Sequence, residues 1–461
     1  MNSITSQAFS HNPKKYTYNI AGDLEVTITV QRNPFALPLD TLFAMAARMN
    51  KKRSFLFVSK VLGKHIPVNP HVSLLAGAAL GVLYAELLGK RCEVSIDELV
   101  QAFTEPETAV NIYSRLMAQR VVLDKPTTFI GFAETATALG HSMYDLFAGR
   151  TKFLHTTREI INELESVISF EEEHSHATSH RCYAVDPELF QDDAPIVLVD
   201  DEMTTGKTAL NIIRELHASY PRQTYVVASL LDWRSAADRA KFVELEQELG
   251  IAIPCLSLLE GSIEVTGQPV LSEREQASQH TTSTAVVKTI ELGAEFEHRI
   301  VTSTTPDGFL NDKPYLAGTG RFGLLQSDNL RLEENCTAAA SILRQERQGE
   351  RTLCLGTGEF MFVPMRIASL MGEGVLYQST TRSPVHPVKQ TDYAIQSAYS
   401  YPSLDDPAVT NYLYNVQHGM YDDVFIFIER EVRNERIEPL LRIVKGLGFV
   451  QVNLVMFTSQ P

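Results

Sequence analysis

The sequence predicts an α/β protein whose first domain is built on a parallel β-sheet with helices on both faces. Three observations predict this class. Short, continuously apolar segments alternate with helical segments between Thr127 and Leu259, as in sheets that are buried on both sides. The chain has 461 residues, which is too long for one ordinary core and fits two or three domains. Its 44% hydrophobic and 21% charged residues are typical of a globular protein.

The expected elements become regular after an irregular start. Alternating residues around Gly22-Asp23 predict a β-hairpin over 16–32. Helical spacing predicts a helix over 39–49, followed by a short strand at 54–58 and helices over 72–88 and near 96–120. The regular part then reads strand 127–132, helix 138–147, strand 152–156, strand 196–200, helix 208–218, strand 224–231, helix 236–249 and strand 251–259.

A change of composition divides the chain in two. Residues 271–289 are rich in Ser, Thr, Gln and charge, so they are interpreted as a linker. It joins a first domain, 1–270 with its core at about 50–260, to a second α/β domain, 290–461. Four strands are expected in the second domain, with the sequences TLCLG, GVLYQ, DVFIFIE and FVQVNLVMF.

The two domains resemble each other in sequence. Gly131-x-x-Glu134 follows a strand in the first, and Gly356-x-x-Glu359 follows a strand in the second. Each is followed, about 25 residues later, by a strand ending in Thr-Thr-Arg, at 156–158 and 380–382. IVLVDDE then corresponds to VFIFIERE. These matches predict a duplicated α/β unit, with chance similarity of short strand–loop segments as the alternative.

Composition excludes several classes of function. A formal net charge of −15 argues against a general nucleic-acid or anionic-membrane surface, which needs a basic excess. The five cysteines are scattered without a C-x-x-C pair, as expected for free thiols in a reducing cytoplasm. No run reaches the ~18 apolar residues of a membrane span. We therefore expect a cytoplasmic protein with no nucleic-acid or membrane partner.

The segment IVLVDDEMTTGKTALN, residues 196–211, carries the chemistry. Its apolar strand delivers Asp200 and Asp201 to the carboxyl edge of the sheet, where open α/β sheets bind ligands. Adjacent carboxylates can accept hydrogen bonds from vicinal ribose hydroxyls. The loop at 204–208 then opens a helix, whose free backbone amides suit a phosphate dianion. Gly206-Lys207-Thr208 alone resembles a P-loop, but the required second glycine is Asp201, so that motif is rejected.

VLVDDEMTTGKT resembles the Asp–Asp–x–x–Thr–Thr–Gly–x–Thr signature of type I phosphoribosyltransferases. It differs from the commonest form in two places, because Lys207 stands where that form often has Gly and Glu202 where it often has an apolar residue. SKVLGKHIPV, GFAETATALG, LHTTRE, EEEHSHATSH and LGTGEF…STTRSP extend the likeness to the phosphoribosyltransferases of bacterial tellurite-resistance and stress operons, which carry a C-terminal extension domain. The resemblance implies a type I phosphoribosyltransferase-like sheet followed by a related, degenerate domain. It also implies binding of phosphoribosyl pyrophosphate (PRPP) by Asp200, Asp201, Thr204, Thr205, Gly206, Lys207 and Thr208.

Three other segments are candidates for the pyrophosphate side of the site. The loop after strand 127–132, with Ala133, Glu134, Thr135 and Ala136, matches the pyrophosphate loop of the superfamily. Glu134 is expected to help Asp200 and Asp201 hold Mg²⁺ through PRPP and water; an ordinary βα loop is the alternative. Arg158 is a candidate for binding phosphate oxygens through its guanidinium, with a surface ion pair as the alternative. Lys60 and Lys64 follow the strand predicted at 54–58 and are also candidates, with solvated surface lysines as the equal alternative.

The polar stretch FEEEHSHATSH, 170–180, is expected to form a hood over the site. His174 and His176 are its candidate catalytic residues, with a passive loop or a transition-metal site as alternatives. The second domain keeps the strands but offers Glu429-Arg430-Glu431 where the first has its phosphate loop. It is expected to shape the acceptor site or an oligomer interface, and a homodimer is compatible with either role.

These residues predict Mg²⁺-dependent transfer of a 5-phosphoribosyl group from PRPP to a small, base-like acceptor, with release of pyrophosphate. The resemblance to the stress-operon enzymes implies that the product is a nucleoside-like stress metabolite. The alternative is a non-catalytic sensor that binds PRPP or a nucleotide on the same fold. A PRPP synthetase ranks last, because its intact ribose-phosphate loop is expected in the second unit rather than the first. The acceptor is not encoded in any recognisable motif.

Overall fold

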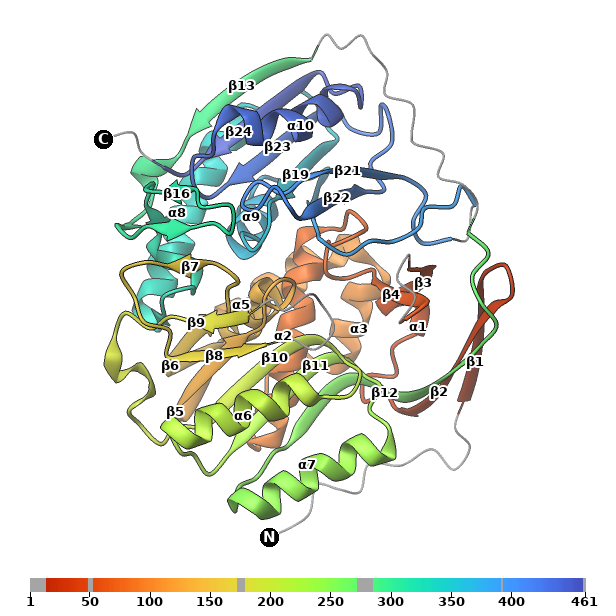
Figure 1. Cartoon of the computed structure of the whole chain (residues 1–461), viewed down its shortest axis with the longest axis vertical. Coiled ribbons are helices and arrows are strands. Elements are labelled where there is room, and N and C mark those ends of the chain that lie inside the picture. The colour runs from red at the N-terminus through yellow and green to blue at the C-terminus, as the bar shows by residue number, and fades with distance from the viewer. Residues whose placement is uncertain (1–13, 49–52, 172–178, 272–284, 391–392, 459–461) are drawn as a thin grey trace.

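The computed structural model describes residues 14–48, 53–171, 179–271, 285–390 and 393–458. Two α/β units lie against each other, each with its own sheet (Figure 1). The larger sheet belongs to the N-terminal unit. Its spatial order is β1 (Lys14–Ala21), β2 (Leu24–Arg32), β12 (Cys255–Thr266), β11 (Tyr225–Asp232), β10 (Ile196–Met203), β5 (Val121–Gly131), β6 (Phe147–His155) and β18 (Leu324–Leu325).

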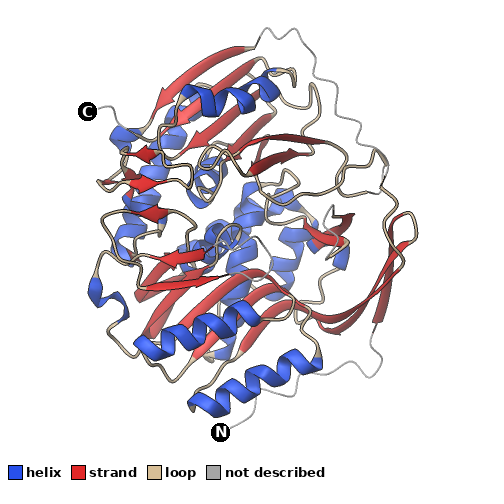
Figure 2. Cartoon of the chain, in the orientation of Figure 1, coloured by secondary structure: helices blue, strands red, loops and turns tan. Residues whose placement is uncertain are grey.

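The five central strands of this sheet, from β12 to β6, run parallel. The side chains of β11 and of residues 196–199 in β10, at the centre of the sheet, are all buried, because helices cover both faces. Helices α6 (Lys207–Ser219) and α7 (Ala236–Leu249) lie on one face, and α2 (Pro70–Leu87) and α5 (Ala136–Asp145) lie on the other (Figure 2). The fold class predicted from the sequence is therefore confirmed.

Helix α2 is the most apolar element of the first unit. The Asn69 side chain caps it by accepting the amide of His71 at 3.0 Å, and Pro70 occupies its first turn. Among the described residues it is the one helix long and apolar enough to cross a membrane, yet 83% of that window is buried inside the fold. It is packed as a core helix, as the sequence predicted. Helices α3 (Ile96–Thr104) and α4 (Ala109–Ala118) pack beside it.

The second sheet repeats the order of the first. It consists of β13 (Val286–Glu291), β24 (Gln451–Met456), β23 (Asp423–Ile428), β19 (Thr352–Gly356) and β20 (Val375–Ser379), all parallel. Strands β24, β23, β19 and β20 take the places of β11, β10, β5 and β6. The match of strand order supports a duplicated unit. The edge strand differs, because β13 precedes the other strands in the chain whereas β12 follows them.

The two units share one hydrophobic core. Helices α8 (Gln326–Gln345) and α9 (Phe362–Leu370) lie between the second sheet and helices α2 and α5 of the first unit. Phe425 and Phe427 of β23 point into this shared core, while Val424 and Ile426 pack against α10 (Asn434–Lys445) on the outer face. Strand β18 comes from the second half of the chain but pairs with β6 of the first sheet.

Short strands complete the fold and connect its halves. Strands β7 (Ile160–Ile161), β15 (Ser303–Thr304) and β16 (Leu310–Asn311) form a small sheet from both units. Two-stranded pairs are made by β3 (Phe43–Ala47) with β4 (Phe55–Ser59), β8 (Ile168–Glu171) with β9 (Ser179–Cys182), β14 (His298–Arg299) with β17 (Tyr315–Leu316), and β21 (Ala398–Pro402) with β22 (Thr410–Tyr414).

Three sequence expectations were wrong. The helix expected over 39–49 is a single turn, α1 (Leu39–Leu42), because β3 pairs with β4 instead and the rings of Phe43 and Phe57 meet edge to face at 4.9 Å; residue 49 lies outside the described residues. The linker expected over 271–289 ends earlier, since β13 begins at Val286. The polar stretch 157–193 contains β7, β8 and β9, which were not predicted.

Candidate active site

The Asp-Asp pair stands where β10 ends at the carboxyl edge of the first sheet. Both carboxylates are partly exposed. The Oδ1 atom of Asp200 accepts the backbone amide of Asp201 at 2.8 Å, which orients the Asp200 carboxylate. The pair is thus placed as the sequence predicted, at the edge where parallel sheets bind ligands.

The loop after the Asp-Asp pair is shaped by Gly206. This residue has φ of +72° and stands immediately before α6. A Cβ placed on it would lie 2.6 Å from the ring of Phe242, so the loop lies directly against α7. Thr204, Thr205 and Thr208 are partly exposed around it. The hydroxyl of Thr205 accepts the amide of Lys207 at 3.3 Å. The N-terminus of α6, the positive end of the helix dipole, lies at this loop.

The predicted pyrophosphate loop joins β5 to α5. A Cβ on Gly131 would lie 2.2 Å from the carbonyl oxygen of Ala136, so only glycine lets the helix start this close to the strand. Thr137 donates to the carbonyl of Glu134 at 2.9 Å. The amide of Ala133 donates to Thr156 Oγ1 at 2.7 Å, so this amide is already used within the protein, contrary to our expectation that it faces a ligand.

Lys64 connects the two loops. Its Nζ donates to Thr135 Oγ1 at 2.6 Å and lies 3.9 Å from a carboxylate oxygen of Asp201. The loop after β4, the pyrophosphate loop and the Asp-Asp pair therefore meet at Lys64. Lys60, on the same loop, is exposed and makes no side-chain contact with either of these segments among the described residues. The structure thus brings one of the two candidate lysines into the site.

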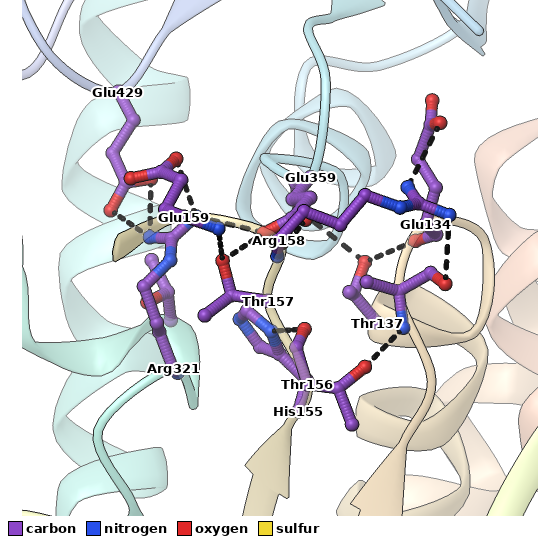
Figure 3. Close-up of polar contacts among 12 residues, drawn as sticks. Glu134, Thr137, His155, Thr156, Thr157, Arg158, Glu159, Arg321, Glu359 and Glu429 are labelled. Atoms are coloured by element: carbon purple, nitrogen blue, oxygen red, sulfur yellow. Dashed lines mark hydrogen bonds and ion pairs between the residues drawn. The ribbon is translucent and has the colours of Figure 1, made fainter. Parts of the chain in front are cut away.

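Arg158 also reaches the pyrophosphate loop. Its guanidinium lies 3.6 Å from the carboxylate of Glu134 and donates to the carbonyl of Ala133 at 3.4 Å. Figure 3 shows the Arg158 side chain extended toward Glu134. Glu134 is mostly buried, and its charge is balanced by this arginine. The two residues, predicted separately, form one unit.

A residue of the second unit that was not predicted from the sequence holds the Arg158 backbone. Glu359, in the loop after β19 of the second unit, accepts the backbone amide of Arg158 at 2.9 Å and the hydroxyl of Thr157 at 2.5 Å. Burial alone would raise the pKa of Glu359, but Arg321 and Arg158 hold that pKa below its usual value. Glu359 is therefore a buried carboxylate that ties the second unit to the candidate site.

Arg321 completes this contact between the units. It is almost fully buried and pairs with Glu429 at 2.7 Å, with Glu159 and Glu359 at 3.7 Å (Figure 3). Arg321 belongs to the GTGRFG segment, which has no strand–helix pair around it and forms no dinucleotide loop. GTGRFG matches the G-x-G-x-x-G pattern of dinucleotide-binding loops only in its letters. Its arginine, Arg321, instead forms buried ion pairs that hold the fold together.

The predicted hood is anchored by a β-hairpin. Strands β8 and β9 pair antiparallel, and β8 packs against α6. The amides of Thr157 and Arg181 bond to each other's carbonyls at 2.8 Å, which ties the hairpin to the Arg158 segment. His180 is fully buried, with Nδ1 3.2 Å from Thr156 Oγ1. His174 and His176 lie outside the described residues.

No group of three or more His, Cys, Asp or Glu side chains within the described ranges is close enough to hold a metal ion by itself. The carboxylates of Asp200, Asp201 and Glu134 thus do not form a preassembled site. A divalent cation here would have to draw most of its ligands from a bound polyphosphate and water, which is the usual habit of Mg²⁺.

A five-stranded parallel sheet with an Asp-Asp loop on one strand and a short βα loop beside it defines a type I phosphoribosyltransferase fold. A family model described as "Phosphoribosyl transferase" matches residues 42–262, and a model described as "TRSP domain C terminus to PRTase_2" matches residues 318–444. The chain therefore carries a phosphoribosyltransferase-family domain at 42–262, followed by a TRSP domain at 318–444. This is the extension domain implied by the resemblance to the tellurite-resistance transferases.

Solved structures of the same class are similar only in outline. Adenine phosphoribosyl transferase from Trypanosoma brucei has 13% identity and a TM-score of 0.31, over 51% of this chain and 82% of that one. The adenine enzyme from Rhodothermus marinus has 14% identity and a TM-score of 0.27, over 48% and 96%. Orotate phosphoribosyltransferase from Mycobacterium tuberculosis has 14% and 0.22, over 47% and 89%. No curated protein matches the chain.

Proposed function

We propose that the protein transfers the 5-phosphoribosyl group of PRPP to a nitrogen of a small, base-like acceptor and releases pyrophosphate. The observation that carries this proposal is the meeting of three loops at Lys64, which contacts Thr135 of one loop and approaches Asp201 of another. A polyphosphorylated ribose would span these loops, with its 5-phosphate on residues 204–208 and its pyrophosphate at residues 133–136.

The barrier to the reaction is the breaking of the bond between C1 of the ribose and pyrophosphate. Positive charge develops on C1 while negative charge builds on the leaving group. Asp200 and Asp201 would hold the ribose hydroxyls, while Lys64 and Arg158 would stabilise the departing pyrophosphate. Because Arg158 is paired with Glu134 in this structure, it would have to turn from that carboxylate toward the phosphate when PRPP binds.

Mg²⁺ would fit this site only together with PRPP. The carboxylates of Asp200, Asp201 and Glu134 are hard oxygen donors, but too few are grouped to hold the cation alone. When bound, it would neutralise part of the pyrophosphate charge. His174 and His176 remain proposed catalytic residues of the hood. A cytoplasmic location is also proposed, because all five cysteines are free thiols.

The experiment measures PRPP affinity and pyrophosphate release separately. Titration calorimetry with PRPP and Mg²⁺ is expected to give at least about a tenfold loss of affinity for Asp201→Asn. Asp124→Asn, on an exposed carboxylate of β5, serves as the control and should bind as the wild type does.

Turnover is then followed by pyrophosphate release from PRPP in a deproteinised cell extract, with mass spectrometry to find the product that gains a phosphoribosyl group. Tight binding with no release in any extract would reject the enzyme and favour the sensor. Unchanged affinity in Asp201→Asn would show that the site has been misplaced.

A further inference from the structure

A second cavity lies between the two units, at the carboxyl edge of the second sheet. It has a volume of about 110 Å³. Loops after β19, β20 and β23 contribute Glu359, Arg382 and Arg430 to its wall, and the first unit contributes Arg158 and Glu159. The carboxyl ends of parallel strands are where such sheets bind ligands. The second unit has lost its phosphate loop but keeps a hollow at the corresponding edge.

Most charged side chains in this wall already have partners. Arg430 donates to the carbonyls of Lys313 and Asn311 at 2.8 and 2.7 Å and to Ser303 at 2.7 Å. Arg436 donates to the carbonyls of residues 404 and 405 and pairs with Asp307 at 2.8 Å. Glu359 is fixed by the Arg158 segment. These groups build the wall and have little capacity left for a ligand.

Arg382 and Asp405 differ from the rest. Both line the cavity, and neither side chain forms a hydrogen bond or a close ion pair with any residue in the described part of the chain. An Asp405 carboxylate oxygen would lie 3.2 Å from a Cβ on Gly358, so the carboxylate rests against the turn after β19. The two side chains feel each other's charge without touching. Because both side chains line the cavity and neither is engaged by another described residue, their charges are available to a ligand.

The charge balance of the cavity restricts what can bind. Four guanidinium groups and four carboxylates line it, namely Arg158, Arg382, Arg430 and Arg436 with Glu159, Glu359, Asp405 and Asp406. The field has no large excess of either sign, so a phosphate dianion is disfavoured. Phe309, Leu404 and Val432 supply an apolar side. This wall fits a small molecule that carries both charges and has an apolar portion.

We propose that this cavity binds a small molecule that has a carboxylate against Arg382 and a protonated amine or ring N–H against Asp405. Free amino acids, and ring carboxylates that carry a ring N–H, share this pair of groups. The cavity is separate from the Asp-Asp site and needs no catalytic step. It is nevertheless linked to that site, because Arg158 lines the cavity and contacts both Glu134 and Ala133 of the pyrophosphate loop.

Titration calorimetry on the full-length protein tests the proposal in the absence of PRPP. The probes are the twenty L-amino acids, orotate as a ring carboxylate with ring N–H groups, and adenine as a ring without a carboxylate. We expect at least one carboxylate-bearing probe, and not adenine, to bind with a Kd below about 10 mM. Whether an amino acid or orotate binds identifies which of the two classes is the ligand.

Variants then locate the bound probe. Arg382→Gln should weaken it by about tenfold or more, with a smaller loss for Arg382→Lys, which keeps the charge but not the planar fork. Asp405→Asn should weaken it by a similar factor. Arg331→Gln, an exposed arginine of α8, is the matched control. All four variants should bind PRPP within about twofold of wild type, which separates this inference from the proposed function.

Three results would overturn the proposal. The first is the absence of binding by every probe to the wild type. The second is binding that Arg382→Gln leaves unchanged, and the third is preferential binding of adenine. If Asp405→Asn does not fold, as judged by near-ultraviolet circular dichroism, the two Arg382 variants still decide the question, because that side chain has no structural partner to lose.

Discussion

At the scale of single residues, the two lysines of the loop after β4 allow a direct comparison. Lys64 contacts Thr135 and approaches Asp201, whereas Lys60 is exposed. Lys64→Met is expected to lower PRPP affinity by about tenfold or more, because a charge facing the phosphates is removed, and Lys60→Met by less than about twofold. Fluorescence or calorimetric titration measures both. Equal losses would mean that PRPP lies differently from the proposed pose.

Asp405 gives a pH-dependent prediction. Burial, reinforced by the nearby Glu159 carboxylate, raises its pKa to about 6, although Arg382 lowers it in part. Glu359 also raises this pKa, and Arg321 lowers it. A carboxyl whose folded-state pKa lies above its unfolded value stabilises the protein fully at low pH, and this contribution is lost as the pH rises through the folded pKa.

Asp405→Asn mimics the protonated form, so it should be more stable than wild type at about pH 7.5, by roughly 1 kcal/mol, and equal to it near pH 4. Denaturant unfolding at the two pH values measures this difference. A constant difference between the two proteins at both pH values would show that another group titrates.

At the scale of elements, the strand–loop–helix unit β10–α6 is where the sequence is most informative. The apolar strand, the Asp-Asp pair and Gly206 all lie where the sequence predicted, because each depends on local backbone chemistry. The helix wrongly predicted at 39–49 failed because contacts between residues distant in sequence, rather than local chemistry, decide the structure there. Its apolar spacing fits a helix, but pairing of β3 with β4 satisfies the same residues through contacts distant in sequence.

Gly206 makes this element testable. Gly206→Ala places a methyl group 2.6 Å from the Phe242 ring at a φ of +72°, so it should destabilise the protein by more than about 2 kcal/mol and weaken PRPP binding. Gly250→Ala is the control, because φ there is +66° but nothing lies within 4 Å; it should lose about 1 kcal/mol and keep PRPP affinity. Similar losses in the two variants would contradict close packing of the loop on α7.

At the scale of the whole molecule, contacts between the units decide what the sequence could not reveal. Glu359 of the second unit reaches Thr157 of the first across 202 positions, and Arg321 of the second unit lies 3.7 Å from Glu159 of the first. Strand order alone did not predict these pairs. The sequence showed the similar loops after β5 and β19. It did not show that the loop after β19 supports the segment that carries Arg158. The free pair of Arg382 and Asp405 was likewise hidden, since no motif joins them.

Arg321 is the residue on which the contact between the two units most depends. Arg321→Met would leave the buried carboxylates of Glu429 and Glu359, and the nearby Glu159, without their shared cation, so we expect a loss of about 3–5 kcal/mol. Arg331→Gln removes an exposed ion pair with Glu297 and should lose less than about 1 kcal/mol. Urea unfolding followed by tryptophan fluorescence compares them. A loss below 1 kcal/mol for Arg321→Met would mean that this contact is held by apolar packing alone.

The edge strand of the second sheet has a consequence for how the chain is made. Val286 of β13 pairs with Gln451 of β24, so β13 meets its partner 165 positions later in the sequence. In a growing polypeptide β13 is present long before β24 has been synthesised. The second sheet can therefore be completed only after β24 has left the ribosome, and such distant pairing is intrinsically slow. A chain that lacks β24 would leave apolar residues of the second sheet exposed, so we expect it to aggregate.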